Sequence, residues 1–207
     1  MSSSHTGIDF SNDISESREF NIINYQDFYS GGGVSIGDIN NDGLVDVFFT
    51  GNMVQNRLYI NKGEMHFEDI TETSGLLSKD YTWSTGSTMV DINNDGWLDI
   101  YVCYSGLVDV EQRRNKLWVN QKDNTFIDEA KKYHIDDAGY AVNANFFDYD
   151  KDGDLDMYLV NQGPEKIRIL IRVLADWNQT SIAVINYIEM TRDTLLTLRW
   201  KQISIVR

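Results

Sequence analysis

The sequence has very little cysteine and no excess of positive charge, and each shortage excludes a class of protein. Cys103 is the one cysteine among 207 residues, so an internal disulfide framework is excluded. Its position in an apolar run predicts a buried thiol. The formal net charge of −14 argues against a nucleic-acid partner, because binding to phosphates needs a basic face.

Long hydrophobic segments and clustered histidines are also missing. No stretch approaches the roughly 20 apolar residues needed to span a bilayer, so no transmembrane segment is predicted. Residues 1–5 lack the basic start and the apolar core of a signal peptide. His5, His66 and His134 are scattered and share no metal-ligand spacing. We therefore predict no catalytic residue and no organic cofactor.

What the sequence does contain is a nine-residue motif that occurs three times, over residues 38–46, 91–99 and 148–156. We call these stretches loop 1, loop 2 and loop 3. Each has Asp or Asn at positions 1, 3, 5 and 9 and a glycine at position 6, which permits a sharp turn. Side chains at alternate positions can face one centre, and their oxygens, with the carbonyl of position 7, suit Ca²⁺, which takes roughly 6–8 oxygen ligands.

The predicted ligands of about three calcium ions are Asp38, Asn40, Asp42, Leu44 and Asp46 in loop 1, Asp91, Asn93, Asp95, Trp97 and Asp99 in loop 2, and Asp148, Asp150, Asp152, Asp154 and Asp156 in loop 3. Loop 3 has the most carboxylates and is expected to bind most tightly. Loops 1 and 2 have Asn at position 3, which is expected to weaken them.

The opening of the motif also occurs in EF-hands, but the flanking residues argue against that alternative. An EF-hand needs a bidentate acid at position 12, and this position is Phe49, Val102 or Leu159 here. These residues lie in β-branched or aromatic runs, so each loop is expected to join two strands. A polar turn without metal is the remaining alternative, and three copies with identical donor spacing favour calcium over it.

The sequence around the loops repeats as well. An Asn-x-Leu-aromatic-x-Asn phrase follows loop 1 at residues 56–61 and loop 2 at residues 115–120. Four short strands in a unit of about 40–50 residues indicate a propeller blade. We therefore predict an all-β fold, an incomplete β-propeller of about three blades, with a solenoid as the alternative.

The predicted division of the chain is an entry segment (residues 1–30), three repeats (31–164, divided into 31–80, 81–137 and a partial 138–164) and an atypical tail (165–207). Gly31–Gly33 opens the first repeat without the Lys-Ser/Thr of a phosphate loop. We expect these glycines where the backbone is crowded near a propeller axis.

The tail differs from the repeats in composition. No glycine follows Gly163, and the Asn-x-Leu-aromatic-x-Asn phrase does not recur. A helix is expected over residues 167–177 and a strand over residues 194–206. Two interpretations stay open: the tail caps the sheet edge of the last blade, or it is an aberrant end of a truncated or frame-shifted gene.

The run from Gly37 to Val47, followed by residues 56–63 and 67–71, resembles FG-GAP/VCBS repeats, the calcium-loop blades of integrin α-chain propellers. Together with residues 3–10, it is most similar to bacterial envelope proteins of the ASPIC/UnbV type, relatives of cartilage acidic protein. The resemblance covers residues 3–163. It implies a seven-bladed propeller and calcium at the loop residues, and full members have more repeats, so the chain resembles a fragment.

These observations predict a calcium-binding propeller module outside the cell or in a bacterial cell envelope, because weak calcium loops suit compartments with about millimolar calcium. We expect an export segment, or a lipid anchor, in the full-length precursor. The module would act in adhesion or binding, with an unknown protein or glycan as partner, or as a scaffold. A propeller-type polysaccharide lyase or hydrolase fragment is the alternative.

Overall fold

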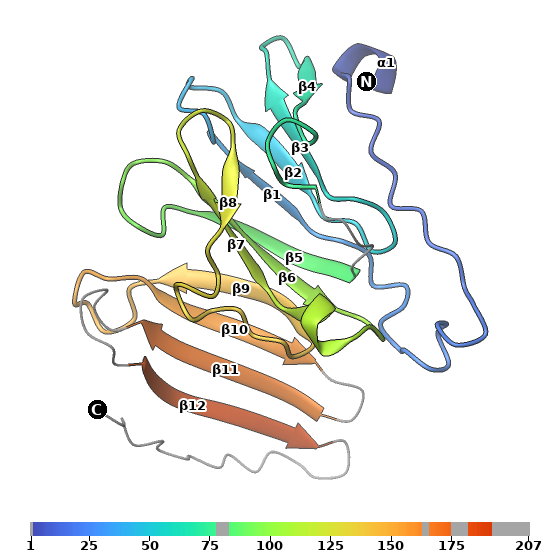
Figure 1. The fold of residues 1–207 in the computed structure, drawn as a ribbon, viewed down its shortest axis with the longest axis vertical. Helices are drawn as coiled ribbons and strands as arrows, with labels where there is room; N and C mark the ends of the chain where they lie inside the picture. The colour runs from blue at the N-terminus through green and yellow to red at the C-terminus, as the bar shows by residue number, and fades with distance from the viewer. Residues whose placement is uncertain (1, 78–82, 163–165, 175–181, 192–207) are drawn as a thin grey trace.

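A computed structural model describes residues 2–77, 83–162, 166–174 and 182–191, and in these ranges the regular secondary structure is almost entirely β-strand (Figure 1). Besides the strands there are one helical turn, α1 (Ser3–Thr6), and one 3-10 helix, η1 (Val110–Arg113). The strands are β1 (Val34–Gly37), β2 (Asp46–Phe49), β3 (Arg57–Asn61), β4 (Phe67–Asp69), β5 (Trp83–Val90), β6 (Asp99–Ser105), β7 (Lys116–Asn120), β8 (Phe126–Asp128), β9 (Ala141–Phe147), β10 (Asp156–Gln162), β11 (Lys166–Leu174) and β12 (Ile182–Thr191).

The strands form three four-stranded antiparallel sheets, each in simple sequential order, β1 to β4, β5 to β8 and β9 to β12. We call them blade 1, blade 2 and blade 3. Their first strands lie next to one another, β1 against β5 and β5 against β9, and the blades follow one another in space (Figure 1). This arrangement confirms the predicted all-β fold of propeller blades.

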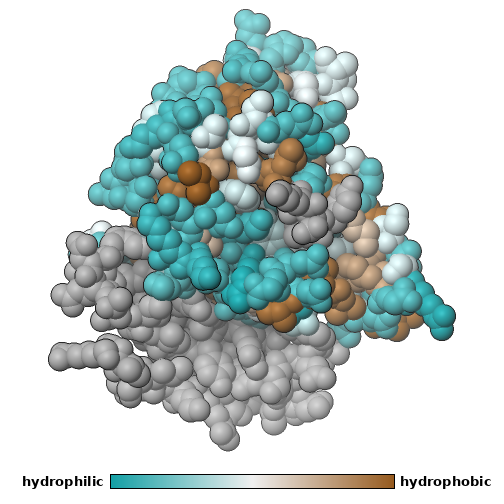
Figure 2. Space-filling view, viewed as in Figure 1, coloured by the Kyte–Doolittle hydropathy of each residue, from teal (hydrophilic) through white to brown (hydrophobic). Residues whose placement is uncertain are grey.

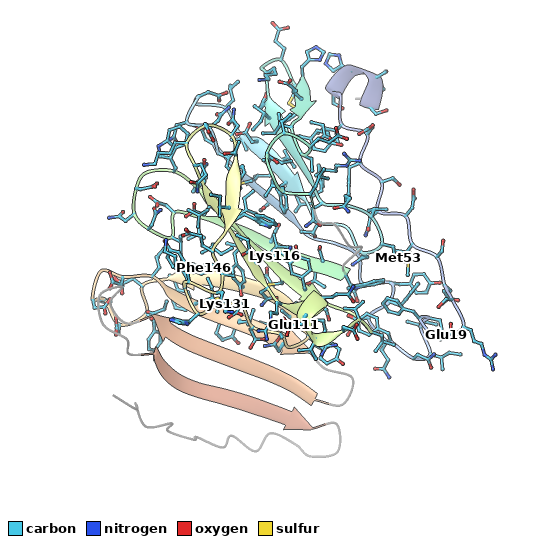
Figure 3. The ribbon with its side chains drawn as sticks, in the orientation of Figure 1. Glu19, Met53, Glu111, Lys116, Lys131 and Phe146 are labelled. Atoms are coloured by element: carbon cyan, nitrogen blue, oxygen red, sulfur yellow. The ribbon has the colours of Figure 1, made fainter. Side chains whose placement is uncertain are left out.

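The hydrophobic core lies between the blades. The central strand of blade 2, β6, is buried on both faces because its side chains alternate in direction. Ile100 and Val102 pack against blade 1, whereas Tyr101 and Cys103 pack against blade 3. Phe146, labelled in Figure 3, is half-buried against the cluster that contains Tyr101 and Cys103. The predicted burial of the Cys103 thiol is confirmed, and burial raises its pKa.

Close contacts between the first strands explain why two of three equivalent positions are glycine. Gly33, Gly86 and Asn143 each lie five residues before the first aspartate of their loop. A Cβ on Gly33 would lie 2.7 Å from the carbonyl oxygen of Thr85, and one on Gly86 would lie 2.4 Å from that of Val142. Both contacts are too short for any side chain, so the backbone is crowded at Gly33, as expected, and also at Gly86.

The entry segment covers the face of blade 1 that points away from blade 2. Asp9 accepts a hydrogen bond from the Tyr59 hydroxyl at 2.8 Å, and the Phe10 ring stacks on Phe49 with centroids 5.0 Å apart. Further along, the aromatic side chains of residues 20–28 surround Trp83, which is 2% exposed. This tryptophan therefore lies in a buried aromatic cluster.

We expect Tyr59→Phe to report on this contact through its pH dependence. Burial, followed by the hydrogen bond to Asp9, raises the pKa of Tyr59 to about 12. Between pH 10 and 12 the folded state keeps a proton that the unfolded state releases, so this residue lowers stability as pH rises through that window. At pH 7 the variant loses one hydrogen bond, about 1 kcal/mol. Denaturation curves should show this deficit shrinking above pH 10, and a constant deficit would contradict the prediction.

Strands β11 and β12 lie in the stretch that composition set apart as a tail, and they complete blade 3. The helix expected over residues 167–177 was wrong where the chain is described, because Lys166–Leu174 is a strand paired with β10. Ile or Val stands at every second position from Ile167 to Val173, which is the period of a strand. The strand expected over residues 194–206 lies outside the described residues.

The surface and the helices agree with the composition. The face of the molecule seen in Figure 2 is largely hydrophilic, with hydrophobic residues in small groups. Among the described residues, no helix is long and apolar enough to cross a membrane.

Candidate metal centres

Each loop connects the first and second strands of its blade, so loop 1 lies between β1 and β2, loop 2 between β5 and β6, and loop 3 between β9 and β10. In every copy, positions 4 and 6 have a left-handed backbone. Position 6 is the predicted glycine, which adopts this conformation without steric cost. The left-handed residues are Asn41, Gly43, Asn94, Gly96, Lys151 and Gly153. The three loops therefore share the same backbone turns, and each joins two strands where an EF-hand would join two helices.

The same internal hydrogen bonds hold each loop in a tight curve. In loop 1, the two carboxylate oxygens of Asp38 accept the amides of Asp42 at 3.0 Å and of Gly43 at 2.8 Å. The first aspartates of loop 2 and loop 3 accept the equivalent amides. These bonds turn the chain around its first carboxylate, as a wrapped ion would require.

The aspartate at position 9 is buried and bonded to backbone amides. In loop 2, Asp99 is 1% exposed, and its two oxygens accept the amides of Ile92 at 3.1 Å and Asn120 at 2.8 Å. Desolvation raises the pKa of Asp99 to about 6, although the two amides lower it. Burial also raises the pKa of Asp46 and Asp156. In loops 1 and 2, position 9 therefore ties its loop to the end of the third strand, at Asn61 and Asn120, whereas Asp156 accepts the amide of Tyr149 within loop 3.

In loop 3 the carboxylates converge. Oxygens of Asp148, Asp150 and Asp156 lie within 4.8 Å of one another, and no other group of three acidic, histidine or cysteine side chains does so among the described residues. Calcium lies about 2.3–2.6 Å from each ligand oxygen, so two ligands of one ion can be at most about 5 Å apart. These three of the five predicted ligands of loop 3 fit this ion in chemistry and in spacing, and Asp152 and Asp154 are not part of the converging group.

A comparison with protein families agrees with this geometry. The model of the FG-GAP-like repeat matches residues 38–102 and 106–159, more than half of the chain. The chain belongs to the FG-GAP-like repeat family. The matched segments begin at loop 1 and end in β10, so they contain all three loops. No curated protein matches the chain.

Within these FG-GAP-like repeats, loops 1 and 2 differ from loop 3 at position 3. The Nδ2 atom of Asn40 donates to Asp42 at 3.0 Å, and that of Asn93 donates to Asp95 at 3.1 Å. Each asparagine therefore donates one hydrogen bond to the carboxylate at position 5 of its loop. Loop 3 has Asp150 at position 3, and a carboxylate cannot donate this bond. Coordination by the carbonyls of position 7 stays a prediction.

Several residues at the loops were not found from the sequence. The Nδ2 atom of Asn41 donates to the carbonyl of Gly96 at 2.9 Å, which joins loop 1 to loop 2. Asn120, in the repeated Asn-x-Leu-aromatic-x-Asn phrase, donates to the carbonyl of Ile39 across the same interface at 2.8 Å. The recurrence of that phrase was visible in the sequence, but the partners of its last asparagine were not.

Lys122 was also missed, and it forms an ion pair with a predicted ligand. Its ammonium lies 3.2 Å from Oδ2 of Asp95. Partial desolvation raises the pKa of Asp95, but the bonds from Lys122, the Trp97 amide and Asn93 outweigh it, so the pKa lies below its usual value. Loop 2 thus contains a positive charge of its own.

Two other arrangements have no place in a metal or catalytic site. Residues 33–37 have the Gly-x-Ser-x-Gly spacing of a nucleophile elbow, which sequence reasoning overlooked. An elbow needs a sharp strand-to-helix turn, whereas Ser35 lies within β1 and is hydrogen-bonded to Ser87 at 3.0 Å. The rings of His5 and His66, which looked scattered, are 4.6 Å apart. Among the described residues, no third ligand group joins them.

Proposed function

We propose that the chain is a calcium-binding β-propeller module that acts outside the cell or in a cell envelope. The observation that carries this proposal is the convergence of Asp148, Asp150 and Asp156 in loop 3. The same backbone path recurs in loops 1 and 2. The shortage of cysteine does not oppose an external location, because the blades are held by their apolar interfaces.

In this proposal each ion holds a loop at the end of its blade. The side chains of positions 1, 3, 5 and 9 and the carbonyl of position 7 would supply the ligands. Bound calcium would neutralise carboxylates that otherwise repel one another, and it would stabilise the folded state because the unfolded chain lacks the site. The loops then present a rigid end of the propeller.

We infer that this rigid end serves adhesion, partner binding or scaffolding. Binding residues are concentrated on loops that a rigid framework positions. The partner would be a protein or a glycan, and the acidic surface makes nucleic acid an unsuitable one. An anchored precursor would place the module on the cell surface.

A calcium titration tests the metal-binding part of the proposal. Isothermal calorimetry on chelator-treated protein should show saturable binding of about three ions, with circular dichroism following the change in melting temperature. Asp150 is exposed, so Asp150→Ala should lower the melting temperature in calcium and leave it unchanged in excess chelator.

Glu19 provides the matched control. It is an exposed carboxylate in the entry segment, far from the loops (Figure 3), and Glu19→Ala should have no effect in either condition. If the folded wild-type protein bound no calcium, the loops would be polar turns without a metal. An equal loss for Asp150→Ala in calcium and in chelator would contradict a metal role for loop 3.

A further inference from the structure

Loops 1 and 2 have the same ligand types, but the turn between the third and fourth strands of their blades differs. Asn61 and Asn120 end β3 and β7, and each accepts the amide two residues later at 2.9 Å, from Gly63 and Lys122 respectively. Both later residues have a left-handed backbone, with φ of 86° and 68°. Gly63 and Lys122 therefore occupy the same position in the two blades.

Only the residue in blade 2 has a side chain that reaches its loop. The Lys122 ammonium lies 3.2 Å from Oδ2 of Asp95, and the same oxygen accepts Asn93 Nδ2 at 3.1 Å. The other oxygen of Asp95 accepts the Trp97 amide at 3.0 Å. Position 5 of loop 2 is thus bonded on both oxygens, and one of its partners is a full positive charge.

The corresponding carboxylate in loop 1 has the amide partners alone. Asp42 accepts the Leu44 amide at 2.9 Å and Asn40 Nδ2 at 3.0 Å. Lys62, which precedes Gly63, pairs with Glu68 at 2.9 Å. Among the described residues, no ion pair reaches Asp42. The two loops therefore differ by one ammonium group at position 5.

We propose that Lys122 is a resident cation of loop 2 that competes with calcium for Asp95 and makes loop 2 bind calcium more weakly than loop 1. This inference rests on the proposed calcium function. An arriving ion must displace the ammonium from Oδ2, and the displaced charge stays nearby and repels the ion. Without calcium, the same ammonium offsets the mutual repulsion of Asp91, Asp95 and Asp99.

The size of the effect follows from exposure. The side chains of Lys122 and Asp95 are 47% and 26% exposed, and ion pairs near the surface contribute about 0–1 kcal/mol. A difference of about 1 kcal/mol changes an affinity about fivefold. We therefore expect a moderate change that orders the loops, with loop 2 filling after loop 1.

Trp97 allows loop 2 to be measured separately. It is position 7 of loop 2, where loop 1 has Leu44 and loop 3 has Asp154. Terbium, a calcium analogue, emits light when a nearby excited tryptophan transfers energy to it. The part of the tryptophan-excited terbium luminescence that is lost in Trp97→Phe is therefore the signal of loop 2, and calcium added as the competitor titrates that signal, while calorimetry reports on all the loops.

The experiment compares three variants of the full chain. Lys122→Gln should raise the affinity of loop 2 about fivefold. Gly63→Lys, the reciprocal exchange, should lower the affinity of loop 1 in calorimetry. Lys62→Gln removes a positive charge that is paired with Glu68 and should leave loop 2 unchanged.

An unchanged luminescence titration for Lys122→Gln, with wild-type protein that binds calcium, would overturn the inference and leave the proposed function standing. An equal increase in Lys62→Gln would also overturn it, because the effect would then come from net charge. If neither the wild-type protein nor Lys122→Gln binds terbium or calcium, the proposed function fails and this inference fails with it.

Discussion

Asp99→Ala should destabilise the calcium-free protein by about 3 kcal/mol, because two buried amides would lose their acceptor and each costs about 1–3 kcal/mol. Asp99 is 1% exposed and accepts the amides of Ile92 and Asn120, one in loop 2 and one at the end of β7. Truncation leaves both amides without a partner in the middle blade. Urea denaturation in chelator, followed by circular dichroism, measures the change.

Asp95→Ala is the matched control for this prediction. Asp95 belongs to the same loop but is partly exposed, and its amide partner, Trp97, is also partly exposed. In chelator it should cost less than about 1 kcal/mol, as surface substitutions usually do. Equal losses for the two variants would show that the buried amides do not govern stability here.

Gly86→Ala should destabilise the protein by about 3 kcal/mol, because one methyl group would force the first strands of blades 2 and 3 apart. The added Cβ would lie 2.4 Å from the carbonyl oxygen of Val142 and 3.0 Å from Cα of Asn143. Backbone atoms on both sides cannot move without disturbing the strands, and overpacking of this kind typically costs about 1–3 kcal/mol or more. Thermal and urea denaturation should both detect the loss.

Asn143 provides the comparison, because it occupies the same position in blade 3 as Gly86 in blade 2. A side chain is already accommodated there, so Asn143→Ala should change the unfolding free energy by less than about 1 kcal/mol. Wild-type stability in Gly86→Ala would mean that the blades are spaced more widely than the contact distances indicate.

The loops could be predicted because their determinants are local. Ligand spacing, the glycine at position 6 and the apolar runs on both sides all lie within about a dozen consecutive residues of each loop. Strands β2, β6 and β10 begin at the position 9 aspartates, as the β-branched and aromatic runs after each loop indicated. The clash distances at Gly33 agree with the crowding expected from a run of glycines.

In the third blade the expected secondary structure was wrong. Composition changes after residue 163, the repeated asparagine phrase stops, and a helix was expected over residues 167–177. The alternating β-branched residues of that stretch instead form β11 against β10. The alternation of Ile and Val was present in the sequence and is the period of a strand. The division of the chain into domains stays a prediction.

The sequence by itself determined which oxygen groups each loop offers and that strands flank them, because spacing and alternation act over neighbouring residues. Only the tertiary structure decided which charges those oxygens meet. Strand pairing within blade 2 brings Lys122 to Asp95. Stacking of blades brings the side chain of Asn120 to the carbonyl of Ile39. The entry segment meets Tyr59 in the same way, across 50 residues. Such contacts depend on packing between distant segments, which no local pattern encodes.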